Sequence, residues 1–84
     1  MNKRQEGVLA AIFEDPVRAN IEWRDVESLL GSLGAEITQG RGSRVRVALR
    51  GVRTVLHRPH PRKELGKLMV RDLRDWLRSA GIAP

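Results

Sequence analysis

Several residue types are missing from this 84-residue chain or scarce in it, and each shortage excludes a class of structure. There is no cysteine, so disulfide bonds and thiolate metal sites are excluded, and a reducing compartment is permitted. No apolar run approaches the ~20 residues of a membrane span. The first residues also lack the apolar segment of a signal peptide. We therefore expect a cytoplasmic protein with no membrane span.

Aromatic residues are also scarce, with two Trp, one Phe and no Tyr. A platform for stacking single-stranded bases is therefore missing, because such platforms are built from aromatic side chains. Both Trp23 and Trp76 fall within apolar stripes at helical spacing, which favours packing in the core over base stacking. Any recognition of nucleic acid should consequently depend on backbone and shape, as in the binding of double-stranded RNA.

Negative charge is the third shortage, and it is local. The chain has 16 Lys and Arg against 10 Asp and Glu, which gives a formal net charge of +6. From Ile37 through Lys63 there is no carboxylate, whereas that segment holds eight Lys and Arg and both histidines. This balance predicts an anionic partner, with nucleic acid first, an acidic protein second and a membrane surface third.

Apolar residues at intervals of three and four predict three helices. The first is short, lies within residues 7–14 and ends before a Pro. The second covers about 23–33 and is stopped by Gly34, and the third covers about 65–80 and is closed by Gly81. The charged positions of the third helix, Arg74 among them, are expected on a solvated outer face.

Alternation predicts strands between the second and third helices. The sequence "AEITQ" (35–39) is expected to form a short strand, and residues 43–50 follow after a glycine-containing loop. The apolar residues of the second strand share one face, and Arg44, Arg46, Ala48 and Arg50 are expected on the other. Arg50-Gly51 predicts a tight hairpin turn to a third strand at 52–57.

Together these elements predict an α+β fold, in which helices cover one face of a three-stranded antiparallel sheet. We expect a single domain over residues 1–84, with an additional N-terminal helix in 1–15 and a core in 23–82. The uncovered sheet face would carry the arginines. Sheet faces of this kind usually mix charges, so arginines without an acid favour contact with phosphates over simple solvation. A solvated face remains the alternative.

Two segments resemble a known family. "ESLLGSLGAEITQGRGSRVRV" and "HRPHPRKELGKLMVRDLRDWLRSAGIAP" are similar to the two conserved blocks of HicA-type toxins of bacterial toxin–antitoxin systems, over roughly residues 23–82. The resemblance implies a double-stranded-RNA-binding-like fold and an mRNA endoribonuclease that needs neither ribosome nor metal nor other cofactor. It also implies neutralisation by a HicB-like antitoxin, and an oligomer only as the complex with that antitoxin.

The sequence departs from the family at one position. The family's catalytic residue is the histidine of a Gly-Ser-His sequence, and here Gly42-Ser43 is followed by Arg44. Arginine stays protonated and cannot act as a general base, although it can bind phosphate and stabilise developing negative charge. Either proton transfer has moved to another residue or the chain binds RNA without cutting it.

Candidate site residues follow from this comparison. Histidine is the side chain whose ordinary pKa suits proton transfer at neutral pH, so both histidines are catalytic candidates beside Arg44. The resemblance to the family's second conserved block puts His60 first and His57 second. Their spacing of three places them on opposite faces of an extended chain, and a metal pair lacks a third ligand. The candidates for RNA contact are Arg41, Ser43, Arg44, Arg46, Arg50 and Arg58.

Four simpler interpretations stay open. The histidines could be solvated side chains at a polar strand end, and Ser43 could cap the strand start instead of binding phosphate. The domain could be a non-catalytic RNA-binding module. The basic face could also be a docking surface for an acidic protein only.

Overall fold

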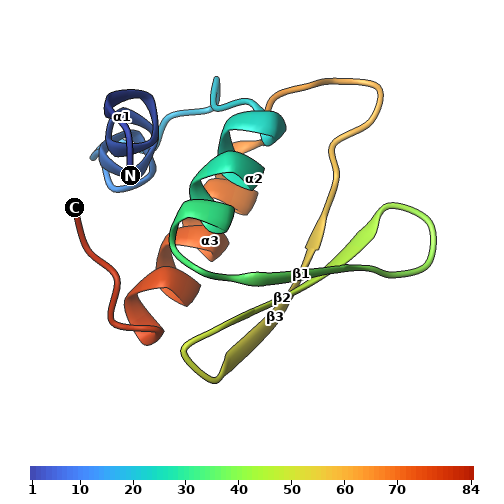
Figure 1. Cartoon of the computed structure of the whole chain (residues 1–84). Coiled ribbons are helices and arrows are strands. Elements are labelled where there is room, and N and C mark those ends of the chain that lie inside the picture. The colour runs from blue at the N-terminus through green and yellow to red at the C-terminus, as the bar shows by residue number, and fades with distance from the viewer.

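Three helices and one antiparallel sheet make up the structure, a computed structural model that describes residues 1–84 (Figure 1). The elements are α1 (Lys3–Ile12), α2 (Trp23–Ser32), β1 (Glu36–Gln39), β2 (Arg44–Leu49), β3 (Val52–His57) and α3 (Lys67–Ser79). This confirms the predicted α+β fold and, after α1, the order of helix, three strands and helix. No helix has the length and apolar character needed to cross a membrane.

The sheet has the order β1-β2-β3, with β2 in the centre. Gln39 faces Val45 across the first pair of strands, and Val47 faces Thr54 across the second. Burial alternates along β2, where Val45 and Val47 are buried and the intervening arginines are exposed. One face of the sheet therefore joins the core, and the other is open to solvent.

Helices cover only the buried face of the sheet, as predicted (Figure 1). α2 and α3 lie between the sheet and α1, which packs on the side of these two helices that faces away from the strands. The core is one cluster of 19 buried apolar residues drawn from every element except β1. Trp23 and Trp76 belong to it, which confirms the prediction that both indoles pack in the core.

The hairpin between β2 and β3 turns at Arg50-Gly51, as predicted. Both residues have positive φ, 51° for Arg50 and 80° for Gly51. Two consecutive positive φ values are typical of a type I′ turn, whose twist matches that of the flanking strands. Gly51 is the residue that tolerates this conformation without strain.

α1 begins earlier than predicted, at Lys3 instead of residue 7. The Asn2 side chain accepts a hydrogen bond from the Gln5 backbone N–H, and the Gln5 side chain accepts one from the Asn2 N–H, both at 2.8 Å. This reciprocal arrangement is a capping box, and it satisfies two N–H groups that the helix itself leaves unpaired. The Asn-x-x-Gln spacing was the sequence signal for this start.

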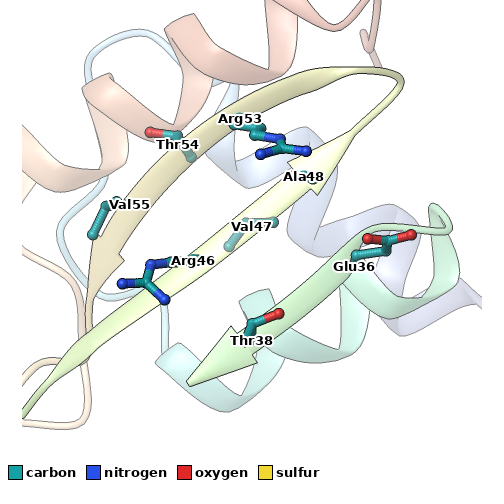
Figure 2. Close-up of a pocket in the computed structure, with 8 residues that line it drawn as sticks. All are labelled: Glu36, Thr38, Arg46, Val47, Ala48, Arg53, Thr54 and Val55. Atoms are coloured by element: carbon teal, nitrogen blue, oxygen red, sulfur yellow. The ribbon is translucent and has the colours of Figure 1, made fainter. Parts of the chain in front are cut away.

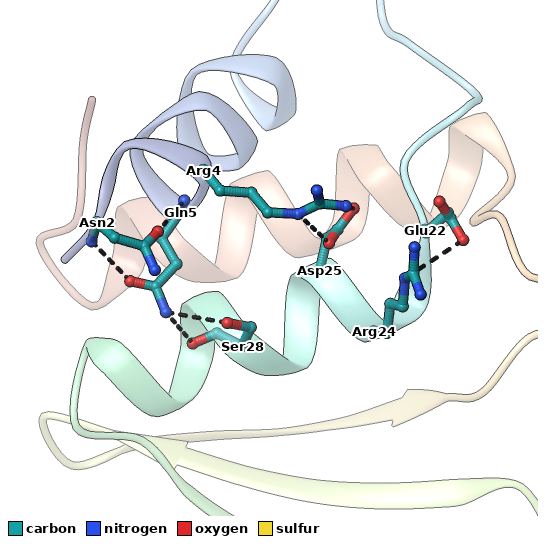
Figure 3. A network of polar contacts seen from close by, with 7 residues as sticks. All are labelled: Asn2, Arg4, Gln5, Glu22, Arg24, Asp25 and Ser28. Atoms are coloured by element: carbon teal, nitrogen blue, oxygen red, sulfur yellow. Dashed lines mark hydrogen bonds and ion pairs between the residues drawn. The ribbon is translucent and has the colours of Figure 1, made fainter.

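Polar contacts fasten α1 to α2 (Figure 3). The Gln5 amide donates to the Ser28 hydroxyl at 2.9 Å. The Arg4 guanidinium donates to Asp25 at 3.0 Å, and this hydrogen bond raises the pKa of Arg4 above its ordinary value. α1 is thus held against α2 by polar groups at its first turn as well as by the apolar side chains of the core.

The segment before α3 differs from the prediction, because α3 begins at Lys67 instead of Leu65. Leu65 is nevertheless buried, and its backbone N–H donates to the carbonyl of Ile21 at 2.8 Å. Glu64 pairs with Glu22 in an isolated bridge on the same stretch. Because this short pairing holds Leu65 in an extended segment, the helix begins only after it.

Arg74 corrects the prediction of a solvated outer face on α3. Its side chain is buried, and its Nε donates to the carbonyl oxygen of Ile12 at 2.8 Å. A terminal N–H of the same guanidinium donates to the carbonyl of Glu14. These two carbonyls lie at the C-terminal end of α1, where helical carbonyls lack partners within the helix. Arg74 therefore caps α1 from α3.

The buried guanidinium of Arg74 gives a prediction about stability. Arg74→Met keeps the aliphatic stem but leaves both carbonyls without their donor, so we expect the free energy of unfolding to fall by about 2 kcal/mol. Urea unfolding would measure this loss. Arg71→Met, at an exposed position of the same helix, should change stability by less than about 0.5 kcal/mol. Equal losses for both variants would contradict the capping role of Arg74.

Candidate nucleic-acid interface

The open face of the sheet gathers side chains from all three strands. Strand alternation and pairing register assign to it the residues Glu36, Thr38, Arg44, Arg46, Ala48, Arg53, Val55 and His57. All are exposed except Ala48, which is half-buried. We call this set the open face, and it carries three arginines and one histidine against a single carboxylate.

Figure 2 shows the middle of this face, which is hollowed between the strands. Arg46 and Arg53 come from neighbouring strands and line the hollow together with Thr38. Glu36 lies at its β1 border, one position before the acid-free segment found in the sequence. The open face is therefore basic but not free of acid, and Glu36 is a residue that the sequence argument missed.

Arg44 and His57 face each other across β2 and β3. Ser43 precedes Arg44 and Arg58 follows His57, and the Arg58 N–H donates to the Ser43 carbonyl at 2.9 Å. This pattern makes Arg44–His57 a non-hydrogen-bonded pair, in which the two Cα atoms are closest, at about 4.5 Å. Both side chains project from the open face. The histidine of β3 thus lies directly opposite the residue that follows Gly42-Ser43.

The loop from Gly40 to Ser43 fixes the start of β2. The Gln39 side chain donates to the carbonyls of Gly40, Gly42 and Arg44, at 3.2, 3.1 and 3.4 Å. The Gly40 N–H donates to the Arg44 carbonyl, and the Arg44 N–H donates to that of Arg41. The sequence did not identify Gln39 as part of the site, because a side-chain amide that bonds to backbone carbonyls needs no particular residue types around it.

Two glycines are required in this loop for different reasons. A Cβ on Gly40 would lie 3.1 Å from the carbonyl oxygen of Arg44, which is closer than side chains ordinarily approach backbone. Gly42 has φ +57°, a conformation that L-residues rarely adopt. Both glycines therefore serve turn chemistry that places Ser43 and Arg44 at the edge of the open face.

Arg50 does not lie on the open face, and the prediction that it shares a face with Arg44 and Arg46 is wrong. It sits in the β2–β3 turn, and its Nη1 donates to the carbonyls of Ala80 and Gly81, both at 3.3 Å. These carbonyls follow the C-terminal end of α3, where a cation is favoured by the helix dipole. The alternation ends at Leu49 because the turn rotates the next residue out of the strand.

The remaining candidates lie outside the open face. Arg41 is exposed in the loop before β2, and His60 is exposed in the segment that connects β3 to α3. Arg58 directly follows His57, so its side chain leaves the strand toward the other side. Its guanidinium lies 4.0 Å from the Glu27 carboxylate on α2. The strand pairing therefore brings together Arg44, Arg46 and His57, whereas His60 lies outside the strands, three residues after His57.

A scan of family models matches residues 23–82 to the HicA toxin of bacterial toxin–antitoxin systems. The match covers α2, the whole sheet and α3, and it leaves α1 outside. A search of curated proteins and a search of solved structures gave no significant match. The chain belongs to the HicA toxin family, whose members are toxins that operate with an antitoxin.

The placement of Arg50 gives a prediction for the turn. Arg50→Asn retains a residue that tolerates positive φ but removes the guanidinium from the end of α3, and we expect a loss of about 1 kcal/mol in unfolding free energy. Thermal or urea unfolding would measure it. Arg41→Asn, which removes an exposed arginine with no hydrogen bond or ion pair from its side chain, is the control and should be nearly neutral. A neutral Arg50→Asn would contradict the role of Arg50 at α3.

Proposed function

We propose that this protein is the toxin of a type II toxin–antitoxin system and acts in the cytoplasm as an endoribonuclease on mRNA, which blocks translation. The observation that carries the proposal is the Arg44–His57 pair on the open face. The family's histidine is missing at position 44, but the strand register supplies an imidazole directly across from it. Membership of the HicA family and the basic character of the surrounding face support the same function.

The proposed reaction is attack of an RNA 2′-hydroxyl on the adjacent phosphorus. His57 accepts the proton of the 2′-hydroxyl as the new 2′ O–P bond forms, and the P–O5′ bond breaks. The leaving 5′ oxygen takes a proton from His60 or from water, and the products are a 2′,3′-cyclic phosphate and a 5′-hydroxyl. General base catalysis of this kind contributes about 10²–10⁴-fold to a rate.

Arg44 and Arg46 hold the phosphate in this proposal. They lie two residues apart on β2 and project from the same face, so both guanidiniums can reach the non-bridging oxygens of one backbone segment. Fixed positive charge beside the phosphorus stabilises the additional charge of the transition state. Arg53 extends the cationic surface to β3, whereas Ser43 and Arg41 border it at the loop.

Cleavage of mRNA by purified protein tests the catalytic assignment. We expect His57→Gln to reduce the cleavage rate by about 10²-fold or more, and His60→Gln to reduce it by less than tenfold. Arg44→His, which restores Gly-Ser-His, should retain cleavage that Arg44→Gln loses. If the wild type neither cleaves mRNA nor arrests growth when produced alone, the nuclease proposal fails. If it cleaves and His57→Gln is as active as the wild type, only the assignment of His57 fails.

The second candidate function is RNA binding without cleavage, and it is favoured by one observation: Arg44 stands where the family's histidine would be. Both candidates predict binding that weakens with salt. Arg46→Gln should lower the slope of log K against log [salt] by about 0.7–0.9, because one phosphate contact is lost. Arg71→Gln, on the outer surface of α3, should leave the slope unchanged. Filter binding at several salt concentrations would measure both, and the absence of RNA affinity at low salt would favour a protein partner instead.

A HicB-like antitoxin is the proposed neutralising partner, and the open face is its proposed target. An acidic surface that covers Arg44, Arg46 and Arg53 would compete directly with RNA for the same cations. A complex with the antitoxin is accordingly the proposed oligomer.

A further inference from the structure

A second basic hollow lies just beyond the C-terminal end of β3, next to the start of α2. It is formed by the N-terminal turn of α2 and the segment 58–63. Backbone hydrogen bonds fix these two parts relative to each other, because the Trp23 N–H donates to the Lys63 carbonyl at 2.9 Å. The adjoining Glu22–Glu64 bridge adds a second connection. The hollow is therefore built by paired backbone and does not depend on side-chain placement alone. We call it the α2 pocket.

The α2 pocket has more positive charge than its carboxylates neutralise. Four cations line it, namely Arg24, Arg58, Arg62 and Lys63. Arg24 lies 3.7 Å from the Glu22 carboxylate, which also lines the pocket, and Arg58 lies 4.0 Å from that of Glu27. Arg62 and Lys63 form no ion pair. Two positive charges are thus left without a partner within the protein.

Two N–H groups of residues that line the pocket have no acceptor within the protein, the Trp23 indole and the Arg24 backbone N–H. Trp23 lines it, and the indole Nε1–H of this residue is buried without any acceptor. Trp23 is only 8% exposed, and a buried donor without a partner costs roughly 1–3 kcal/mol. The first turn of α2 has no side-chain cap. The Lys63 carbonyl accepts the Trp23 backbone N–H and the Glu22 carbonyl accepts the Asp25 N–H, so the Arg24 N–H is the one left open. A free N–H at a helix N-terminus favours an anion.

We propose that the α2 pocket binds one phosphate group of the RNA, separate from the phosphate held on the open face. The charge agrees with this ligand, since two unpaired cations match a group that carries one to two negative charges. The donors agree as well, because a phosphate accepts hydrogen bonds from guanidinium, ammonium and N–H groups at once. A cation would be repelled by the same lining. The identity of the ligand as RNA rests on the proposed function, but phosphate binding itself does not.

The position of the α2 pocket gives it a role in placing the substrate. Arg58 and His57 are consecutive, and their side chains leave the end of β3 on opposite sides. An RNA strand that passes around this end would contact His57 on the open face and Arg58 in the pocket. Binding of one phosphate in the pocket would then determine which neighbouring 2′-hydroxyl reaches His57. Arg62 and Lys63 are positioning residues in this proposal and do not touch the reacting atoms.

The indole N–H signals of Trp23 and Trp76 in a ¹⁵N-labelled protein provide the test. Trp76→Phe or Trp23→Phe assigns the two signals, and Trp76, whose indole N–H donates to the Val52 carbonyl, is the internal control. Sodium phosphate is titrated at constant ionic strength against sodium chloride. We expect a saturating shift of the Trp23 signal only. Arg62→Gln should weaken the apparent affinity about threefold to tenfold, and Arg71→Gln should not change it.

Two uncleavable 2′-O-methyl oligonucleotides, with and without a 5′-phosphate, identify the source of the phosphate. A larger Trp23 shift with the 5′-phosphate assigns the pocket to a terminal phosphate, and equal shifts assign it to an internal one. Trp23 shifts with inorganic phosphate but with neither oligonucleotide would overturn the assignment to RNA. No Trp23 shift with phosphate, an equal shift with chloride, or no effect of Arg62→Gln would overturn the pocket itself. The phosphate titration and the oligonucleotide comparison can both be interpreted whether or not the protein cleaves mRNA.

Discussion

The burial of one face of β2 is the constraint on which the rest of the site depends. Val45 and Val47 are almost completely buried, and they hold the strand against the core. Because successive side chains alternate, Arg44 and Arg46 must then face solvent. A slip of one residue would bury both guanidiniums without partners and expose the valines, so the register is strongly specified. The pairing of His57 with Arg44 follows from that register and from the two-residue turn at Arg50-Gly51.

Around this strand, the molecule uses arginine in two different ways. Arg44, Arg46 and Arg53 are exposed on the open face, where their side chains form no hydrogen bonds or ion pairs within the protein. Arg50 and Arg74 instead donate to carbonyls at the ends of helices. The same side chain serves both purposes because its planar group carries several donors and a permanent charge. Of these five arginines, the three on the open face are free to bind phosphate, so a count of arginines overstates the size of that interface.

The two basic surfaces proposed for RNA meet at the end of β3. The open face presents Arg44 and His57 on one side, and the α2 pocket presents Arg58 on the other. Cross-strand pairing fixes the first surface, and the connection between Trp23 and Lys63 fixes the second. A substrate held at both would be positioned before any chemistry begins, which is how binding energy contributes to the rate of a reaction.

Much of the fold could be read directly from the sequence. The helical stripes and the alternation of β2 are local patterns, and each predicted its element because the periods of helix and strand differ. The tight turn at Arg50-Gly51 and the stop at Gly34 could be predicted because glycine tolerates positive φ. The acid-free segment and the Gly-Ser-Arg sequence likewise indicated where the candidate site lies. The roles of Arg50 and Arg74 could not be read, since a hydrogen bond to a distant carbonyl depends on the docking of α1 and α3. The pairing of His57 with residue 44 and the enclosure of the α2 pocket were also decided by tertiary structure, because strand register and chain closure bring together residues that no local period connects.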